Sequence, residues 1–162
     1  MLLSDTDIQS LIDSKQLIID PYDPKDLREA SVKLHMQKSI IKYKDNNLVD
    51  LRSDTDVQHY DFELYDTGYK MQPNEFFLGV TAEKITMPNG YFGLIQTRGS
   101  AAQVGLEAIF GDGQVDPGTD GHIKLPIKNN SNQILVIYPG LYIAKLYIFQ
   151  MSSPALHPYT KA

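Results

Sequence analysis

Residues 111–121 read Gly111-Asp112-Gly113-Gln114-Val115-Asp116-Pro117-Gly118-Thr119-Asp120-Gly121, with four glycines and three acids between two apolar runs. Glycine tolerates positive φ and lets another molecule approach the backbone, and the Asp-Pro-Gly sequence favours a tight turn directly after the acid. We interpret this segment as the floor of a small-molecule site with Asp116 as its central carboxylate. An ordinary hairpin loop is the alternative, and the spacing of the residues does not separate the two.

The residues after this turn alternate between apolar and polar side chains, which is typical of a strand. Ile123, Leu125 and Ile127 are therefore expected to face inward. Pro126 has no N–H to donate, so it indicates an edge or an interrupted ladder.

The segment before the turn reads Arg98-Gly99-Ser100-Ala101-Ala102-Gln103-Val104-Gly105 and follows an apolar run over residues 91–97. This composition predicts one short helical turn that ends at a glycine. Its amino end, beside Arg98, would suit an anion. A capped turn with a surface arginine is the alternative.

The rest of the chain is dominated by short apolar or alternating runs that are separated by turns. A short helix is expected from Ser4 to Lys15, with Ile8, Leu11 and Ile12 on one face. Strands are expected over residues 17–20, 30–36, 76–81, 91–97, 134–137 and 141–149. The polar segment over residues 42–66 is expected to point Tyr43, Leu51, Phe62 and Leu64 inward. About eight to ten strands and two short helices predict an all-β fold, a distorted barrel or jelly roll, in one domain over residues 1–162.

Composition excludes several classes of function. The chain has 162 residues, a formal net charge of −5 and no cysteine. A net negative charge argues against electrostatic binding to the phosphates of duplex nucleic acid. The absence of cysteine excludes thiol chemistry and cysteine metal sites. No run resembles a membrane span or a secretory signal, so a cytoplasmic location is expected.

The order of these segments resembles the superfamily of trimeric dUTP diphosphatase and dCTP deaminase, almost from end to end. The N-terminal helix with residues 30–34 resembles the start of the deaminase branch. The other segments that carry the resemblance are Phe77-Leu78-Gly79-Val80-Thr81, Thr97 to Leu106, Gly113-Gln114-Val115-Asp116-Pro117-Gly118 and Gly140 to Leu146. Each segment alone is a weak signal, but their order makes the assignment of the fold strong.

The resemblance implies a homotrimer whose sites lie between subunits and bind a pyrimidine deoxynucleoside triphosphate. The backbone of Gly113, Gln114 and Val115 would read the base, with Thr119 near the sugar, and Asp116 would orient or deprotonate a water. The phosphates would be held by Arg98, Gly99, Ser100, Gln103 and Lys145.

Several residues depart from the family pattern. Lys33 replaces an aspartate that is linked to magnesium in the diphosphatase branch, and a lysine cannot ligate that ion. Gly99 and Gln103 replace a hydroxyl residue and a basic residue of the phosphate motif. The remaining departures are Gln114 for an arginine, Thr119 for the aromatic residue that stacks on deoxyribose, and Lys145 for a glutamine.

The departure with the largest chemical consequence is Pro126, which occupies the position of the catalytic glutamate of deaminases. Proline cannot transfer a proton, and Glu107 lies ahead of the turn, where it is a poor substitute. The tail that closes over the triphosphate in the family is expected to be missing or much shortened.

Three hypotheses remain. The first is a dUTP diphosphatase-like hydrolase in which Asp116 orients water and Mg²⁺ is carried by the nucleotide phosphates, so that no residue is assigned as a metal ligand. The second is a binding or regulatory homologue without catalysis. The third is a dCTP deaminase with an unusual base.

Overall fold

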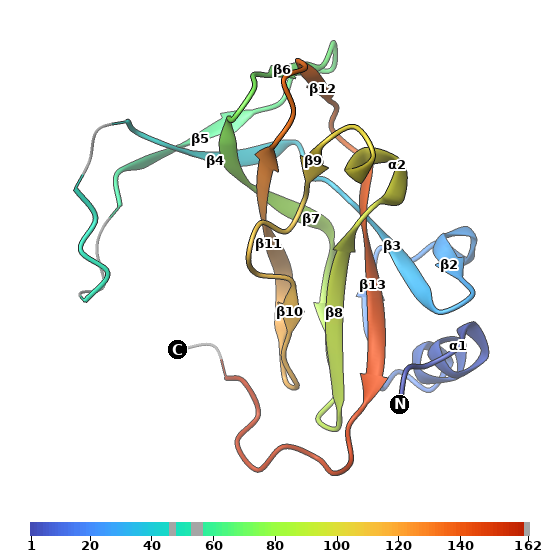
Figure 1. The fold of residues 1–162 in the computed structure, drawn as a ribbon. Coiled ribbons are helices and arrows are strands. Elements are labelled where there is room, and N and C mark those ends of the chain that lie inside the picture. The colour runs from blue at the N-terminus through green and yellow to red at the C-terminus, as the bar shows by residue number, and fades with distance from the viewer. Residues whose placement is uncertain (46–47, 53–56, 161–162) are drawn as a thin grey trace.

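The computed structural model describes residues 1–45, 48–52 and 57–160. These residues form mainly antiparallel strands, and the expected all-β fold is confirmed (Figure 1). The helices in this part of the chain are α1 (Asp5–Asp13), α2 (Gly99–Ala102) and the 3-10 helix η1 (Pro24–Asp26). None of the described helices is long and apolar enough to cross a membrane.

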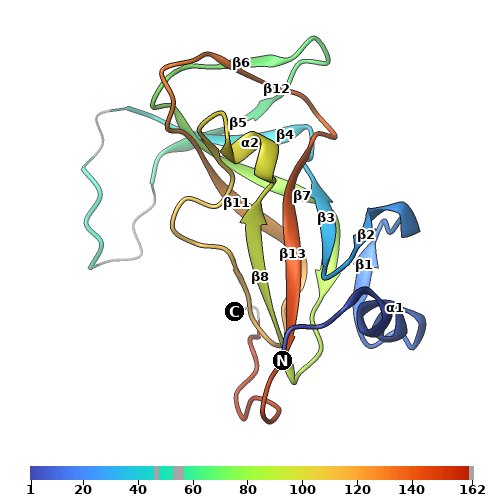
Figure 2. The same cartoon turned by 45° about the vertical axis from the view of Figure 1, so that its right-hand side comes forward.

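One five-stranded sheet carries Lys145 and leads into the 98–103 segment, both of which are expected to hold phosphates. Its order is β10 (Gln114–Val115), β8 (Tyr91–Thr97), β13 (Tyr142–Gln150), β3 (Ser31–His35) and β2 (Leu27–Arg28), and each neighbouring pair is antiparallel. Figure 2 shows β8, β13 and β3 side by side, with α1 beyond β2 at one edge.

The second large sheet has six strands. Its order is β5 (His59–Glu63), β4 (Ser39–Tyr43), β7 (Phe76–Thr86), β11 (Asp120–Asn129) and β9 (Leu106–Glu107), with β1 (Ile18–Asp20) also paired to β7. A small sheet joins β6 (Tyr69–Met71) to β12 (Leu135–Ile137). Among the described residues the sheets remain separate, so the fold is a distorted form of the expected barrel rather than a closed one.

Alternation along the strands builds the core. Val32 and Leu34 of β3, Ile95 of β8 and Leu125 of β11 are fully or almost fully buried, because every second side chain of a strand points to the same face. Ile123 is only partly buried, since the register of β11 against β7 shifts between His122 and Lys124. The helix α1 buries Ile8 and Leu11 as expected.

The expectation that four apolar side chains of the polar segment 42–66 point inward is correct in part. Leu64 is fully buried, but Leu51 is 92% exposed, so its inward placement is wrong. Leu51 lies in the connection between β4 and β5, outside both strands, where no alternation directs its side chain.

The 111–121 segment crosses between the two large sheets. Val115 of β10 pairs with Gly93 of β8, whereas Asp120 of β11 pairs with Thr86 of β7. The two arms of the turn therefore pair with different sheets rather than with each other, which excludes a two-stranded hairpin whether or not this segment forms a site.

Candidate functional site

Asp116 lies in a tight turn that is fastened to the end of β7. The Thr119 N–H donates to the Asp116 carbonyl (3.1 Å), and Gly118 has φ of 87°. Gly118 N donates to the Met87 carbonyl (3.0 Å), and Met87 N donates to the Thr119 carbonyl (2.8 Å). The Asp116 side chain is exposed, and its carboxylate has no hydrogen bond or ion pair within the described part of the chain. The turn therefore presents a free carboxylate on a fixed backbone.

A cleft of about 390 Å³ opens beside this carboxylate. Its lining includes Asp112, Gln114, Asp116, Thr119, His122 and Tyr159. Tyr159 reaches the cleft because the segment after β13 folds back and its N–H donates to the Pro117 carbonyl (2.7 Å).

His122 and Tyr159 are lining residues that the sequence analysis did not assign to the site. His122 stands at a polar position of the alternating strand, so the pattern allowed it to face the cleft. Nothing in the local sequence indicates the approach of Tyr159, since that contact depends on the reversal of the chain after β13.

Only some backbone N–H and C=O groups of β10 are available to a ligand. The Gly113 carbonyl accepts a hydrogen bond from Ile95 N (2.6 Å), and the Val115 side chain is buried in the core. β10 is the edge strand of its sheet, and backbone groups of successive strand residues point to opposite sides. The N–H and C=O of Gln114 therefore face the open edge, although its N–H lies 3.4 Å from the Asp112 carboxylate.

The expected short helical turn after β8 is confirmed as α2. Gly105 closes it with φ of 88° and donates its N–H to the Ala102 carbonyl (3.0 Å). Ser100 and Gln103 are exposed on this turn, and a Cβ added at Gly99 would have no atom within 4 Å. The turn thus has room for the hydroxyl that the family pattern carries at Gly99.

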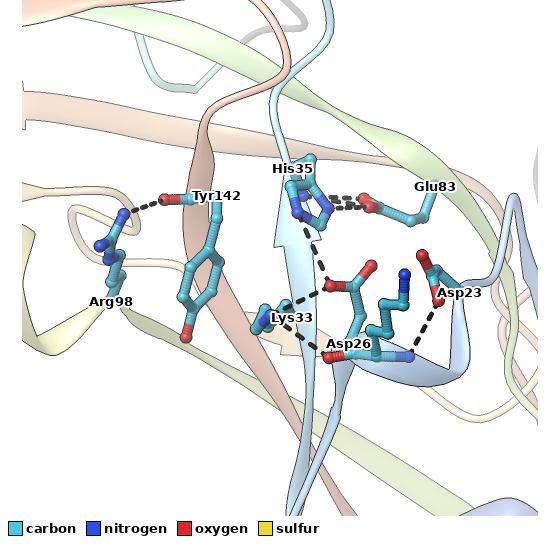
Figure 3. Close-up of polar contacts among 8 residues, drawn as sticks. Asp23, Asp26, Lys33, His35, Glu83, Arg98 and Tyr142 are labelled. Carbon is cyan, nitrogen blue, oxygen red and sulfur yellow. Dashed lines mark hydrogen bonds and ion pairs between the residues drawn. The ribbon is translucent and has the colours of Figure 1, made fainter.

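Arg98 is held by β13 rather than lying free at the surface. Its backbone N–H donates to the Ile143 carbonyl (2.8 Å), and its Nη1 donates to the Tyr142 carbonyl (3.4 Å). The guanidinium carbon lies 4.9 Å from the centre of the Tyr142 ring, which is within the range of a cation–π contact. Figure 3 shows Tyr142 between Arg98 on one side and Lys33 on the other.

Lys33 and Lys145 stand directly opposite each other on β3 and β13. The Lys33 ammonium forms an ion pair with Asp26 (3.2 Å) and donates to the Lys25 carbonyl (3.3 Å). The next polar position of β3, His35, uses Nδ1 to contact the buried Glu83 carboxylate (2.7 Å), which also accepts the His35 backbone N–H. Figure 3 shows this chain of contacts continuing from Lys33 to Glu83.

These residues do not fit a magnesium ion held by the protein. Magnesium prefers oxygen ligands, and the Asp26 carboxylate is engaged by an ammonium group at 3.2 Å. The described residues also contain no cluster of three or more His, Asp or Glu side chains that could hold a metal.

Asp116 and the residues expected to hold phosphates lie far apart within one chain. Val115 pairs with Gly93, so Asp116 lies level with Phe92, six residues before Arg98 along β8. At a rise of about 3.3 Å per residue, this spacing corresponds to about 20 Å. Arg98 and Ser100 line a separate hollow of about 200 Å³, and Lys145 lines another of about 340 Å³.

Pro126 causes no loss of pairing in the sheet. Its carbonyl accepts a hydrogen bond from Phe110 N (2.7 Å), so its nitrogen faces the same side, where β9 pairs only with Lys128 and Asn129. The ladder between β11 and β7 runs without a register shift through Pro126, so it is not interrupted there, whereas no strand in the described part of the chain pairs with the other side of β11 at Pro126, which fits the expected edge position. Glu107 lies opposite Lys128, and its carboxylate accepts a hydrogen bond from Asn130 (2.9 Å).

Comparison with known proteins identifies the family. The family model for dCTP deaminase-like proteins matches residues 2–151. The chain belongs to the dCTP deaminase-like family. It is 35% identical over 162 residues to a dUMP-forming dCTP deaminase of Corynebacterium efficiens, covering 98% of this chain and 84% of the relative. A dUMP-forming dCTP deaminase of Persephonella marina is 35% identical over 161 residues, covering 98% and 89%.

Solved structures support the same fold. A 2′-deoxycytidine 5′-triphosphate deaminase from Agrobacterium tumefaciens superimposes with a TM-score of 0.69 at 13% identity, over 91% of this chain. The match spans 48% of the Agrobacterium chain, about half its length. A mutant dUTPase from phage phi11 of S. aureus, whose structure reveals the coordination of a structural Mg(II) ion, gives 0.56 at 16% identity, over 90% of this chain and 97% of that one. The resemblance stated from the sequence is confirmed at the level of family and fold.

Proposed function

We propose that this member of the dCTP deaminase-like family is a nucleotide hydrolase that converts dUTP to dUMP and pyrophosphate. The observation that carries the proposal is the Asp116 carboxylate, which is exposed on a fixed turn and has no partner in the described part of the chain. Such a carboxylate is available to accept a proton from water. The relatives named above are dUMP-forming, and the proposed reaction retains that product without the deamination step.

Asp116 would accept a hydrogen bond from a water molecule and orient its oxygen toward the α-phosphorus. The new bond joins this oxygen to phosphorus, the bond from phosphorus to the bridging oxygen breaks, and pyrophosphate leaves with the bond electrons. The water proton passes to the Asp116 carboxylate. Arg98, Ser100 and Lys145 would hold the phosphates through charge-assisted and neutral hydrogen bonds.

The open edge of β10 is suited to the pyrimidine. The Gln114 C=O can accept a hydrogen bond there, and its N–H, which also donates to Asp112 Oδ1 at 3.4 Å, can donate one, which matches the mixed donor and acceptor edge of uracil. Deamination is disfavoured because Pro126 has no side-chain group that transfers a proton and the Glu107 carboxylate is engaged by Asn130.

The site requires residues from more than one copy of the chain. A nucleotide cannot contact Asp116 and Arg98 of one chain in the same small pocket, since about 20 Å of β8 separates their levels. A homotrimer in which the 111–121 turn of one copy meets α2 of the next would bring the two regions together. The separation of the two hollows supports this assembly.

The direct test is incubation of the purified protein with dUTP and, separately, with dCTP, followed by chromatography of the nucleotides. We expect dUMP and pyrophosphate from dUTP and no loss of dCTP. Formation of dUTP or dUMP from dCTP would instead support a deaminase, and lack of turnover of both at high protein concentration would contradict hydrolysis of these substrates.

A second candidate is a nucleotide-binding regulator without turnover. It is favoured by the substitutions at Gly99 and Gln103 and by the attachment of Arg98 to the Tyr142 carbonyl and ring. A rise in melting temperature with dUTP, without hydrolysis, would support this function because a ligand that binds only the folded state stabilises it.

A further inference from the structure

A β-bulge places Tyr142 and Lys145 on one face of β13. The register against β3 shifts between Tyr142 and Ala144, and the two consecutive residues Ile143 and Ala144 are both fully buried. A bulge adds one residue to a strand and re-aims the side chains that flank it. Tyr142 and Lys145 are consequently both directed outward, although they are three positions apart.

This face gathers two cations beside the Tyr142 ring and a third, Lys145, on the neighbouring position of the same sheet. Arg98 lies 4.9 Å and the Lys33 ammonium 5.5 Å from the ring centre, and Lys145 is the cross-strand partner of Lys33. Tyr142 lines both the hollow that contains Arg98 and the groove of about 340 Å³ that contains Lys145. We name Lys33, Arg98 and Lys145 together the cationic face.

Acids balance the charges of the cationic face only in part. Like charges directly opposite in an antiparallel pair destabilise a sheet, and Lys33 and Lys145 are such a pair. Asp26 neutralises Lys33 in part, but Lys145 and Arg98 form no ion pair within the described residues. Arg28 and Glu29 both line the groove and offset each other in formal charge.

Two hydrogen bonds hold the Lys33 ammonium in place, and its third N–H can still donate to a ligand. Its ammonium group has three N–H donors, of which the Asp26 carboxylate and the Lys25 carbonyl take two. The Lys145 ammonium makes no hydrogen bond with a described residue and lies 5.9 Å from the Tyr147 ring centre. Donors therefore remain on both strands: Lys145 lines the groove of about 340 Å³, and Lys33 is its cross-strand partner.

We propose that the cationic face binds the polyphosphate chain of the substrate in its metal-free form, with Lys33 and Lys145 supplying the positive charge directly. A polyphosphate that carries Mg²⁺ has a smaller negative charge, and its hydrated metal would lie against ammonium groups that repel it. Metal-free polyphosphate makes charge-assisted hydrogen bonds to both lysines and to Arg98. The proposal deepens the proposed function by defining the ionic form of its substrate.

Isothermal titration calorimetry of the full chain with inorganic pyrophosphate and with dUTP tests this proposal, in excess EDTA and in excess Mg²⁺. Initial heats are analysed over times too short for hydrolysis of dUTP, and pyrophosphate is not a substrate of the proposed reaction. We expect both ligands to bind in EDTA, and Mg²⁺ to weaken binding by about tenfold.

Lys145→Gln and Lys33→Gln should each weaken binding of metal-free pyrophosphate by about tenfold and reduce the difference between EDTA and Mg²⁺. Lys70→Gln is the matched control, because it removes the same charge from an exposed position on β6. Circular dichroism and the melting temperature report whether each variant is folded. The Lys145 variant is the more informative, since its side chain has no ion pair to lose in the fold.

Binding that requires Mg²⁺ would overturn the proposal, as would equal pyrophosphate affinity in wild type and both lysine variants. These results are separate from the test of hydrolysis. Metal-free pyrophosphate binding without turnover of dUTP contradicts only the proposed function, whereas Mg²⁺-dependent turnover that ignores Lys33 and Lys145 contradicts only the present inference. Binding of dUTP without binding of pyrophosphate would show that the nucleoside, not the cationic face, provides the affinity.

Discussion

The cleft beside Asp116 and the cationic face beside Tyr142 are built in opposite ways. The Asp116 carboxylate is free on a rigid turn, with Asp112 and Asp120 also lining its cleft. The cations of the other region are tied to their surroundings, Arg98 through two β13 carbonyls and Lys33 through Asp26 and the Lys25 carbonyl. In the cleft, Asp116 keeps the residue of the family pattern. In the cationic face, Lys33 and Lys145 stand where the family pattern has other residues.

This difference separates two requirements of phosphate chemistry. A carboxylate that orients water must retain an unoccupied acceptor, whereas cations that hold phosphates can be positioned by neighbours without losing their charge. The cleft is therefore expected to control turnover, and the cationic face is expected to control affinity. Two variants and one change of condition distinguish these roles, and a third variant lies outside both regions.

Asp116→Asn should produce the largest effect. We expect dUTP hydrolysis to fall by about a hundredfold to ten-thousandfold, since the amide cannot accept the water proton, while the melting temperature stays nearly unchanged because the side chain is exposed. Turnover is measured by release of pyrophosphate. Asp61→Asn, at an exposed position of β5, is the control. Wild-type turnover in Asp116→Asn would remove this residue from catalysis.

Arg98→Lys should change affinity more than turnover. Lysine cannot reproduce a planar group that stacks on Tyr142 and donates to its carbonyl, so we expect the KM for dUTP to rise about tenfold. The same exchange at Arg52, which is exposed and paired with Asp50, should have no effect. A fall in kcat with an unchanged KM would contradict the division between the two regions.

Added salt should weaken nucleotide binding but not nucleoside binding. Screening reduces the attraction between exposed cations and phosphates, so the Kd for dUTP should rise several-fold from about 50 mM to about 500 mM salt. Deoxyuridine, which lacks phosphates, should bind in the cleft with little dependence on salt. Equal salt dependence of the two ligands in calorimetry would show that the cleft, rather than the cationic face, dominates the electrostatics.

Glu75→Gln, outside both regions, should affect stability alone. Burial alone would raise the pKa of the Glu75 carboxyl, but hydrogen bonds from Tyr69, Lys42 and the Gln72 N–H outweigh burial and hold the pKa below its usual value. Its contribution to stability is therefore present above the ordinary pKa of about 4.3 and is lost as the pH falls through the folded-state pKa.

Urea unfolding measures this last effect. We expect Glu75→Gln to lower the free energy of unfolding at pH 7 by about 1 kcal/mol, and the difference from wild type to shrink toward pH 3. Binding of dUTP should remain unchanged. A difference that grows at low pH would contradict the direction of the Glu75 pKa shift.

The sequence predicts local structure better than the relation between segments. Alternation predicted β3 and the buried residues of β11, and glycine with alanine predicted the short turn α2, because these patterns depend on neighbours in the chain. The crossing of the 111–121 segment between sheets was not predictable, since the partner of each arm is a strand distant in sequence.

The candidate site shows the same limit. Asp116 and Arg98 were named from motifs, but their separation along β8 appears only when the register of Val115 against Gly93 is known. His122, Tyr159 and Tyr142 were not assigned to either region from the sequence. The bulge at Ile143 and Ala144 has no mark in the sequence, because both residues are apolar and either could occupy the inward position of a regular strand.

Tyr142 also provides an optical reporter of the cationic face. The chain contains ten tyrosines and no tryptophan, so a Tyr142→Trp variant would have a single indole. That indole would stand between Lys33 and Arg98, where its emission responds to charge and to water. Arrival of a phosphate could then be followed by fluorescence on the millisecond scale, separately from any change at Asp116.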